Sequence, residues 1–260
     1  MKKNLSKKKL LDSKERCKKY RLKILEMSQN VSALHLGGSF SCIEIFDTIL
    51  NIINSKTENF ILSKGHVAIL NYILLKDKNI LKEKHLKNYC KKDGILGVHP
   101  IVKTPGITAS TGSLGHGLGI ATGLALANKN QTYYTLLSDG ELQEGSTWEA
   151  IMAIPNLNAN NMCIIIDNND LVSYNNLSKS HSNMYPIEEK LISFGWDAKV
   201  CDGHKVNEIY KSLYSKKNKP LALIAKTIKG YPVSFMSNKP IWHYRSPNKE
   251  ELEIAIKDLN

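Results

Sequence analysis

Three uninterrupted apolar runs constrain the fold of this chain more than any other feature. Residues 133–137, 162–166 and 221–225 lack the polar alternation of a strand with one solvated face, so each is predicted to be a strand buried on both faces. A helical pattern over residues 147–157 separates the first two runs. Strands joined through helices predict an α/β fold, with a doubly wound, mostly parallel sheet and helices on both faces.

The first third of the chain is predicted to be helical. Apolar residues recur at intervals of three and four along one helical face, at Cys17, Tyr20, Ile24, Met27, Val31 and Leu34. We expect the basic residues between them to be solvated. Further helices are predicted over residues 41–53, directly after 63–66, over 81–92 and, in a glycine-rich stretch, over 111–128.

Length and composition indicate one globular domain. The 260 residues suffice for a single α/β domain, residues 1–260, of which 1–30 would form a basic helical N-terminal arm. Hydrophobic residues make up 42% and charged residues 23%, which is too polar for a membrane protein. No stretch resembles an export signal or a membrane span, so the protein is expected in the cytoplasm. The five dispersed cysteines are predicted to be reduced thiols.

Oxygen-bearing residues follow two of the predicted strands. Asp139 closes the first strand and Asn169 the second, with the backbone carbonyl of Leu171 two positions later. Ligands bind beyond the carboxyl ends of parallel strands, and Mg²⁺, Ca²⁺ or Mn²⁺ prefer such oxygen ligands. Gly140 lets the backbone approach a phosphate, and a helix starting near 145–146 would favour an anion. The two turns together predict a metal and phosphate site.

These turns resemble the metal motif of thiamine diphosphate-dependent enzymes, Gly-Asp-Gly followed by Asn-Asn at a similar spacing, although Ser138 stands in place of the first glycine. The resemblance narrows to the transketolases. Segments that match this family in order are 62–66 (Leu-Ser-Lys-Gly-His), 97–100 (Gly-Val-His-Pro), 111–117 (Thr-Gly-Ser-Leu-Gly-His-Gly), 138–150, 227–230 (Thr-Ile-Lys-Gly) and 242–247 (Trp-His-Tyr-Arg-Ser-Pro). The resemblance extends from about Ser28 to Leu259 and implies the thiamine diphosphate-binding fold.

The resemblance implies roles for residues within these segments. The metal would be held by Asp139, Asn169 and the carbonyl of Leu171. Thiamine diphosphate would bind against His66, His99, Gly112, Leu114, Asp139, Gly140, Glu141, Asn169 and His243. The residues expected to act in catalysis are His35, His99 and His243.

Histidines carry most of these expected roles. The resemblance implies that His35 and His243 reach the donor and acceptor sugars, and that His99 lies near the reactive carbon of the cofactor. His66 would contact the diphosphate. An unperturbed histidine has a pKa near 6.5, so it donates, accepts or changes charge near neutral pH during proton transfer to sugar hydroxyls. The histidines that match no family motif include His85, His181 and His204.

A second protein chain is expected. In the family, a glutamate on a separate pyrimidine-binding domain contacts the cofactor, and that domain would follow this one in a full-length enzyme. The 260 residues correspond to the first domain alone, so we expect the partner to be a C-terminal transketolase subunit. The cofactor would lie between the two chains, in an α2β2 assembly.

The expected reaction is the transfer of a two-carbon ketol unit from a ketose or ketose phosphate to an aldose. Residues 171–176 depart from the common family sequence and look more like a variant from specialised sugar pathways. Donor, acceptor and pathway therefore stay open at this point.

Three other functions also stay open. A component of another thiamine diphosphate enzyme, deoxyxylulose phosphate synthase-like or 2-oxoacid decarboxylating, is disfavoured by His35 and His243, which suit sugar hydroxyls. Ser138 raises the alternative of an inactive regulatory homologue. The net charge is +12, and eleven of the 36 Lys and Arg residues lie in the first 23 positions. This charge suggests nucleic-acid binding as a third alternative function. No recognition motif accompanies that charge, so neither nucleic acid nor a membrane is expected as a partner.

Overall fold

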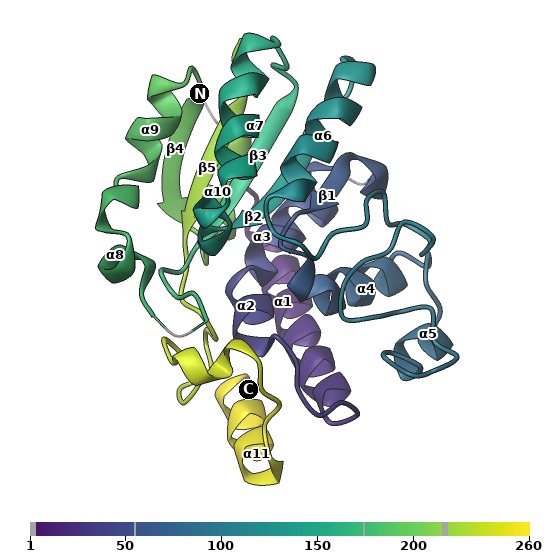
Figure 1. Cartoon of the computed structure of the whole chain (residues 1–260). Helices are drawn as coiled ribbons and strands as arrows, with labels where there is room; N and C mark the ends of the chain where they lie inside the picture. The colour runs from purple at the N-terminus through teal and green to yellow at the C-terminus, as the bar shows by residue number, and fades with distance from the viewer. Residues whose placement is uncertain (1–3, 55, 174, 215–217) are drawn as a thin grey trace.

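The computed structural model describes residues 4–54, 56–173, 175–214 and 218–260, so Lys2, Lys3 and Tyr174 of the segments considered above lie outside the described residues. The strands of the described chain form one parallel sheet in the order β1-β2-β3-β5-β4 (Figure 1). Their bounds are β1 Phe60–Leu62, β2 Tyr133–Ser138, β3 Met162–Asn168, β4 Asp197–Asp202 and β5 Leu221–Lys226. The predicted parallel α/β fold is confirmed.

Helices surround this sheet. The α-helices are α1 Lys7–Ser28, α2 Leu36–Ser41, α3 Ile43–Asp47, α4 Ala68–Asp77, α5 Glu83–Lys87, α6 His116–Ala127, α7 Gly145–Asn156, α8 Leu177–Ser180, α9 Ile187–Ser193, α10 Val206–Leu213 and α11 Lys249–Asp258. A π-helix, η1 Thr48–Ile53, continues α3. The 3₁₀ turns are η2 Thr57–Asn59, η3 Gly65–Val67, η4 Asp139–Gln143, η5 Ser182–Met184 and η6 Pro240–His243.

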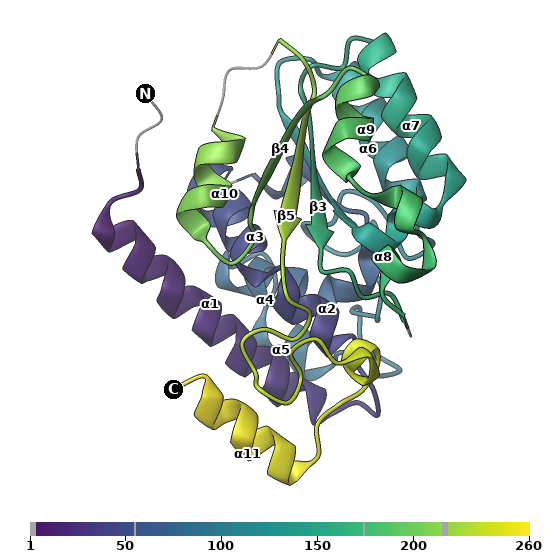
Figure 2. The same ribbon diagram turned by 90° about the vertical axis from the view of Figure 1, so that its left-hand side faces the viewer.

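Each face of the sheet carries its own apolar core. Neighbouring side chains of a strand point to opposite faces, so Cys163 and Ile165 of β3 enter one core while Ile164 and Ile166 enter the other. Helices α1, α3, α4 and α10 cover the first core, and α6, α7 and α9 cover the second (Figure 2). Burial on both faces is the reason that the central strands lack polar alternation.

Helix α1 packs along the domain, as its apolar face predicts (Figure 2). Its predicted apolar face is buried through Met27, and the helix ends at Ser28, so the last two positions of the predicted face lie beyond it. The expectation that the intervening basic residues are solvated is wrong for Arg21. Its side chain is 5% exposed and pairs with Glu44 of α3 at 2.7 Å. This ion pair satisfies the buried guanidinium.

Two predicted helices are interrupted. The stretch 41–53 is divided at Cys42, whose backbone leaves the helical region at φ −111° and ψ 13°. The stretch 81–92 contains only the short α5, because Cys90 adopts a left-handed φ of 56° and its N–H donates to the Leu96 carbonyl at 2.8 Å. Local apolar periodicity does not reveal such breaks.

The predicted helix 111–128 begins only at His116. Gly115 takes a left-handed φ of 84° and turns the chain there, so residues before it form a loop at the sheet edge. Two strands were not predicted from the sequence. β1 is apolar but has only three residues, and β4 is an edge strand whose side chains are mostly half-buried, so neither is a long apolar run.

Candidate functional site

The carboxyl ends of β2 and β3 meet a cavity of about 260 Å³. The predicted site residues that line it are His35, His66, His99, Gly112, Leu114, Asp139, Gly140, Asn169, Leu171 and His243. Of the predicted set, Glu141 is not in the lining. Residues of the lining that sequence reasoning missed include Lys64, Gln143 and Lys229.

The turn that follows β2 is joined to the turn that follows β3 through Asp139. Its carboxylate is buried, and one oxygen accepts from the Gly140 N–H at 2.8 Å. The other oxygen accepts from the Asp170 N–H at 2.5 Å. Asp170 has a left-handed φ of 61°, which directs the chain back under this carboxylate. The two strand ends are therefore fixed relative to one another.

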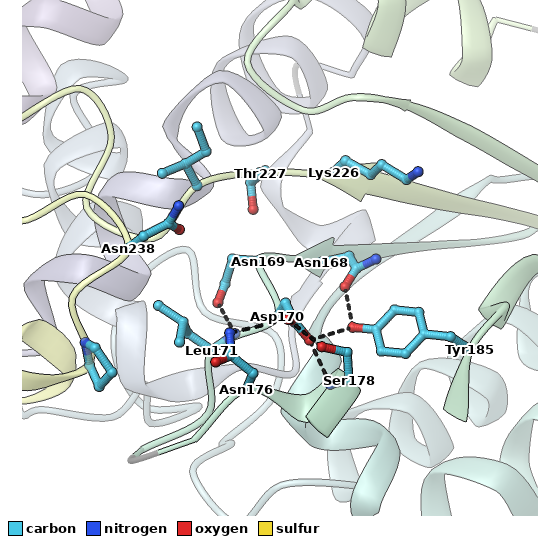
Figure 3. A pocket seen from close by; sticks show the side chains of 12 residues that line it. Asn168, Asn169, Asp170, Leu171, Asn176, Ser178, Tyr185, Lys226, Thr227 and Asn238 are labelled. Carbon is cyan, nitrogen blue, oxygen red and sulfur yellow. Dashed lines mark hydrogen bonds between the residues drawn. The ribbon is translucent and has the colours of Figure 1, made fainter. Parts of the chain in front are cut away.

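The Asp170 side chain fastens the second turn, as Figure 3 shows from an adjoining polar pocket of about 540 Å³. Its carboxylate accepts from the Ser178 hydroxyl at 2.7 Å, the Asn176 amide at 3.2 Å and the Tyr185 hydroxyl at 3.1 Å. Burial would raise the pKa of Asp170, but the bonds from Ser178, Tyr185 and Asn176 outweigh burial and lower it. This anchor fixes the turn that carries Asn169 and Leu171, in which the Asn169 amide oxygen accepts from the Leu171 N–H at 3.1 Å.

The predicted metal ligands suit a hard cation that also binds phosphate. Among the described residues, no group of three or more His, Cys, Asp or Glu side chains is arranged to hold a metal. The oxygen ligands that the cavity lining offers a metal are the Asp139 carboxylate, the Asn169 amide oxygen and the Leu171 carbonyl. Burial, followed by the charge of Asp167, raises the pKa of Asp139 to about 6. A cation beside that carboxylate would favour its charged form, so these residues fit a metal such as Mg²⁺.

A buried ion pair lies beneath the cavity. The Lys64 ammonium donates to Asp167 at 2.5 Å and to the Gly38 carbonyl at 3.2 Å. The two charged side chains are 1% and 0% exposed. Asp167 also accepts from the Ser41 and Thr227 hydroxyls, so its charge is fully hydrogen-bonded. Lys64 belongs to the matched segment 62–66, but its position in that segment gave no hint of this pairing.

A second buried lysine points into the cavity. The Lys229 ammonium donates to the Leu171 carbonyl at 2.7 Å and lies 3.0 Å from Nδ1 of His243. Burial lowers the pKa of Lys229 to about 8, and the charge of Lys64 acts in the same direction, against the opposing carboxylate of Asp139. Asp167 already compensates the charge of Lys64, so Lys229 is the ammonium group that makes this cavity suited to an anionic ligand.

Three histidine rings from separate segments meet on one side of the cavity. The ring centroid of His35 lies 5.1 Å from that of His66 and 5.3 Å from that of His243. Nδ1 of His35 is buried without a hydrogen-bond partner among the described residues. Because a buried polar atom is costly to leave unpaired, this nitrogen is a contact point for a ligand.

These histidines are neutral, which corrects the expectation that they change charge near neutral pH. Burial, with the positive charge of neighbouring groups, lowers the pKa of His35 to about 3. Burial and then Lys229 lower the pKa of His243 to about 4. Burial also lowers the pKa of His66 well below its ordinary value. Each ring therefore acts as a neutral donor and acceptor.

The loop before α6 explains the positions of Gly112 and Glu141. A Cβ on Gly112 would lie 3.0 Å from a ring carbon of His99, so any larger residue there would push against that ring. Glu141 accepts from the Gly115 N–H at 2.8 Å and from the Ser63 hydroxyl. Its contacts thus brace the loop from outside the cavity. The predicted helix start at 145–146 is likewise absent from the cavity lining.

Comparison with known proteins places these features in a family context. A family model described as "Transketolase, thiamine diphosphate binding domain" matches residues 48–257. The chain is 35% identical over 262 residues to an apulose-4-phosphate transketolase subunit of Actinobacillus succinogenes, covering 94% of this chain and 95% of that protein. The protein of the same name from Phocaeicola vulgatus is 30% identical, over 93% of this chain and 92% of that protein.

Longer proteins match over part of their length. Human transketolase is 36% identical over 211 residues, which are 79% of this chain and 34% of that protein. Among solved structures, transketolase from Campylobacter jejuni superposes with a TM-score of 0.89 at 24% identity, over 95% of this chain and 42% of that chain. This likeness shows a common fold. None of the helices in the described residues is both long and apolar enough to cross a membrane.

Proposed function

This chain belongs to the transketolase family, whose thiamine diphosphate-binding domain it contains, and from that premise we propose that it is the diphosphate-binding subunit of a two-chain transketolase. The observation that carries the proposal is the meeting of Asp139, Asn169 and the Leu171 carbonyl with buried lysines and neutral histidines in one cavity. This set suits a metal-bound diphosphate beside a hydroxylated substrate. The enzyme transfers a two-carbon ketol unit from a ketose phosphate donor to an aldose acceptor.

The strand ends would hold the cofactor. Asp139, Asn169 and the Leu171 carbonyl provide the protein ligands of Mg²⁺, with Ca²⁺ or Mn²⁺ as substitutes. Lys229 and His66 line the same cavity and supply a charged and a neutral donor to diphosphate oxygens. Thiamine diphosphate, when bound, supplies the group that stabilises a carbanion.

The neutral histidines would bind the sugar hydroxyls. The Lys229 ammonium can only donate, so the contact at 3.0 Å assigns Nδ1 of His243 as acceptor and leaves its ring proton on Nε2. His243 therefore offers Nε2–H to a substrate hydroxyl, while His35 offers the unpaired Nδ1. His99, held against Gly112, is proposed to act nearest the reactive carbon of the cofactor.

A partner chain would complete the site. The two bacterial relatives are named as subunits and match this chain over nearly their whole length, whereas human transketolase matches over 34% of its own. We propose that a second chain provides the pyrimidine-binding domain and that two copies of each form an α2β2 enzyme in the cytoplasm. The names of those relatives make apulose 4-phosphate the first donor to test.

The test begins with gentle purification from the protein's own cells in Mg²⁺ and thiamine diphosphate, followed by native mass spectrometry. A stoichiometric second chain with bound cofactor is expected. The purified complex is then assayed for ketol transfer from apulose 4-phosphate, with xylulose 5-phosphate as the comparison donor. Recovery of this chain alone, without cofactor, would overturn the two-chain proposal and favour an inactive regulatory homologue.

A further inference from the structure

We propose that His204, which does not line the cavity, is a positioning residue that fixes Lys229 for contact with the cofactor diphosphate. His204 follows β4, on the far side of β5 from the metal ligands. It matched none of the sequence motifs that pointed to the site. The inference rests on the proposed cofactor role of the cavity.

Lys229 needs an external constraint because it lies on an irregular segment between β5 and η6. Its flexible side chain must direct an ammonium group at the Leu171 carbonyl, 2.7 Å away, and at Nδ1 of His243. Ordering a lysine side chain costs rotamer entropy, so its backbone must be held firmly for the contact to form. The groups that hold residues 228–231 therefore control where the ammonium lies.

His204 holds this segment on both sides of Lys229. Its Nε2 accepts the backbone N–H of Ile228, the preceding residue, at 2.8 Å. Its ring stacks on that of Tyr231, two residues beyond, with centroids 4.0 Å apart and planes 30° apart. Because Nε2 is an acceptor, the proton of the neutral ring lies on Nδ1, which faces Glu44 at 3.3 Å. The orientation of the ring is thus set from its opposite edge.

The anchor behind His204 is a buried ion pair. Glu44 receives two bonds from one guanidinium nitrogen of Arg21, at 2.7 and 2.9 Å. Nε of Arg21 donates to the Tyr231 carbonyl at 3.2 Å, so the pair contacts the segment directly as well. The two charged side chains are 5% and 9% exposed. A continuous set of contacts therefore runs from α1 and α3 through His204 to the lysine.

Residue pairs that act through one another show non-additive effects, which separates positioning from general stability. His204→Phe keeps an aromatic ring over Tyr231 but removes the acceptor for the Ile228 N–H. His204→Gln keeps an acceptor on a side chain of comparable reach. Lys229→Met removes the ammonium, and the double variant His204→Phe/Lys229→Met completes the cycle.

The measurement is the dissociation constant of thiamine diphosphate, in Mg²⁺, for the full chain with any partner that copurifies, together with the melting temperature. We expect His204→Phe to weaken binding about tenfold and His204→Gln to restore most of it, because one hydrogen bond to a positioning group is lost and then replaced. In the Lys229→Met background, His204→Phe should change binding less than about twofold.

Equal losses from His204→Phe with and without Lys229 would overturn the inference, as would unchanged binding accompanied by a lower melting temperature. Those results would assign His204 to stability alone. If the wild-type protein binds no thiamine diphosphate, the proposed function fails and this inference with it. If the wild-type protein binds thiamine diphosphate but the effects of His204→Phe and Lys229→Met on affinity are additive, only the positioning role of His204 is wrong.

Discussion

The Lys229 ammonium donates to the Leu171 carbonyl at 2.7 Å, the same oxygen that we propose as a ligand of Mg²⁺. A carbonyl oxygen has two lone pairs and accepts from both, but two cations on one oxygen repel each other. An anion bound beside both cations would offset this repulsion. We therefore expect the metal and the diphosphate to bind together, and the metal alone to bind weakly.

Substituting Lys229 tests this coupling. Lys229→Met removes the charge, so thiamine diphosphate should bind at least about tenfold more weakly, because a hydrogen bond to a charged group contributes about 1.5–3 kcal/mol. Binding of Mn²⁺ alone should become tighter. Isothermal titration calorimetry measures both. Lys249→Met is the matched control, since Lys249 is an exposed lysine at the start of α11 and lines neither pocket. A loss of affinity for both ligands would contradict the coupling.

Substituting Asp139 tests the metal site. Asp139→Asn keeps the size of the side chain but removes the only carboxylate of the cavity lining. We expect the rise in melting temperature caused by Mg²⁺ with thiamine diphosphate to disappear, because ligand stabilisation follows affinity. Without ligands the variant should be less stable than wild type at pH 7, because its amide nitrogen replaces one of the two oxygens that accept the Gly140 and Asp170 N–H groups. Removal of a buried charge, whose burial raises the pKa of Asp139 to about 6, offsets part of that loss. The rise caused by ligands is therefore measured against the ligand-free variant.

Asp93→Asn is the control for that experiment, because Asp93 is exposed on a loop outside the cavity lining. The rise in its melting temperature caused by Mg²⁺ with thiamine diphosphate should equal that of wild type. If the melting temperature of the Asp139→Asn protein rises as much as that of wild type when these ligands are added, the metal binds elsewhere.

The apolar runs and the residues at strand ends were readable from the sequence, whereas the charged groups that complete the site were not. Burial on both faces makes residues 162–166 of β3 an apolar run, and parallel topology then places Asp139 and Asn169 at one edge. The partners of Lys64 and Lys229 depend on where long side chains turn in three dimensions. Edge strand β4 escaped prediction because most of its side chains are only half-buried, so its sequence is not an apolar run.

The buried pair of Lys64 and Asp167 gives a prediction about stability. Lys64→Met leaves an uncompensated buried carboxylate, so unfolding free energy should fall by about 3–5 kcal/mol. Lys64→Met/Asp167→Asn removes both charges and should lose less than the two single variants added together. Denaturant titration measures each value. Lys76→Met, in a partly exposed ion pair with Glu83, should change stability by less than about 1 kcal/mol. Additive losses would show that the two charges do not depend on each other.

The neutral histidines predict how stability depends on pH. Burial lowers the pKa of His243 to about 4 and that of His35 to about 3, whereas both lie near 6.5 in an unfolded chain. As pH falls below about 6.5, the unfolded chain takes up protons that the folded chain does not, so stability present above that pH is progressively lost toward pH 4. His243→Gln removes one such proton, and its melting temperature should therefore fall less than that of wild type between pH 7 and pH 5. His181→Gln changes an exposed side chain outside the cavity lining and serves as the control. Parallel losses in wild type and His243→Gln would show that His243 carries its proton in the folded protein, and the hydrogen bond assigned from Lys229 to its Nδ1 would then be wrong.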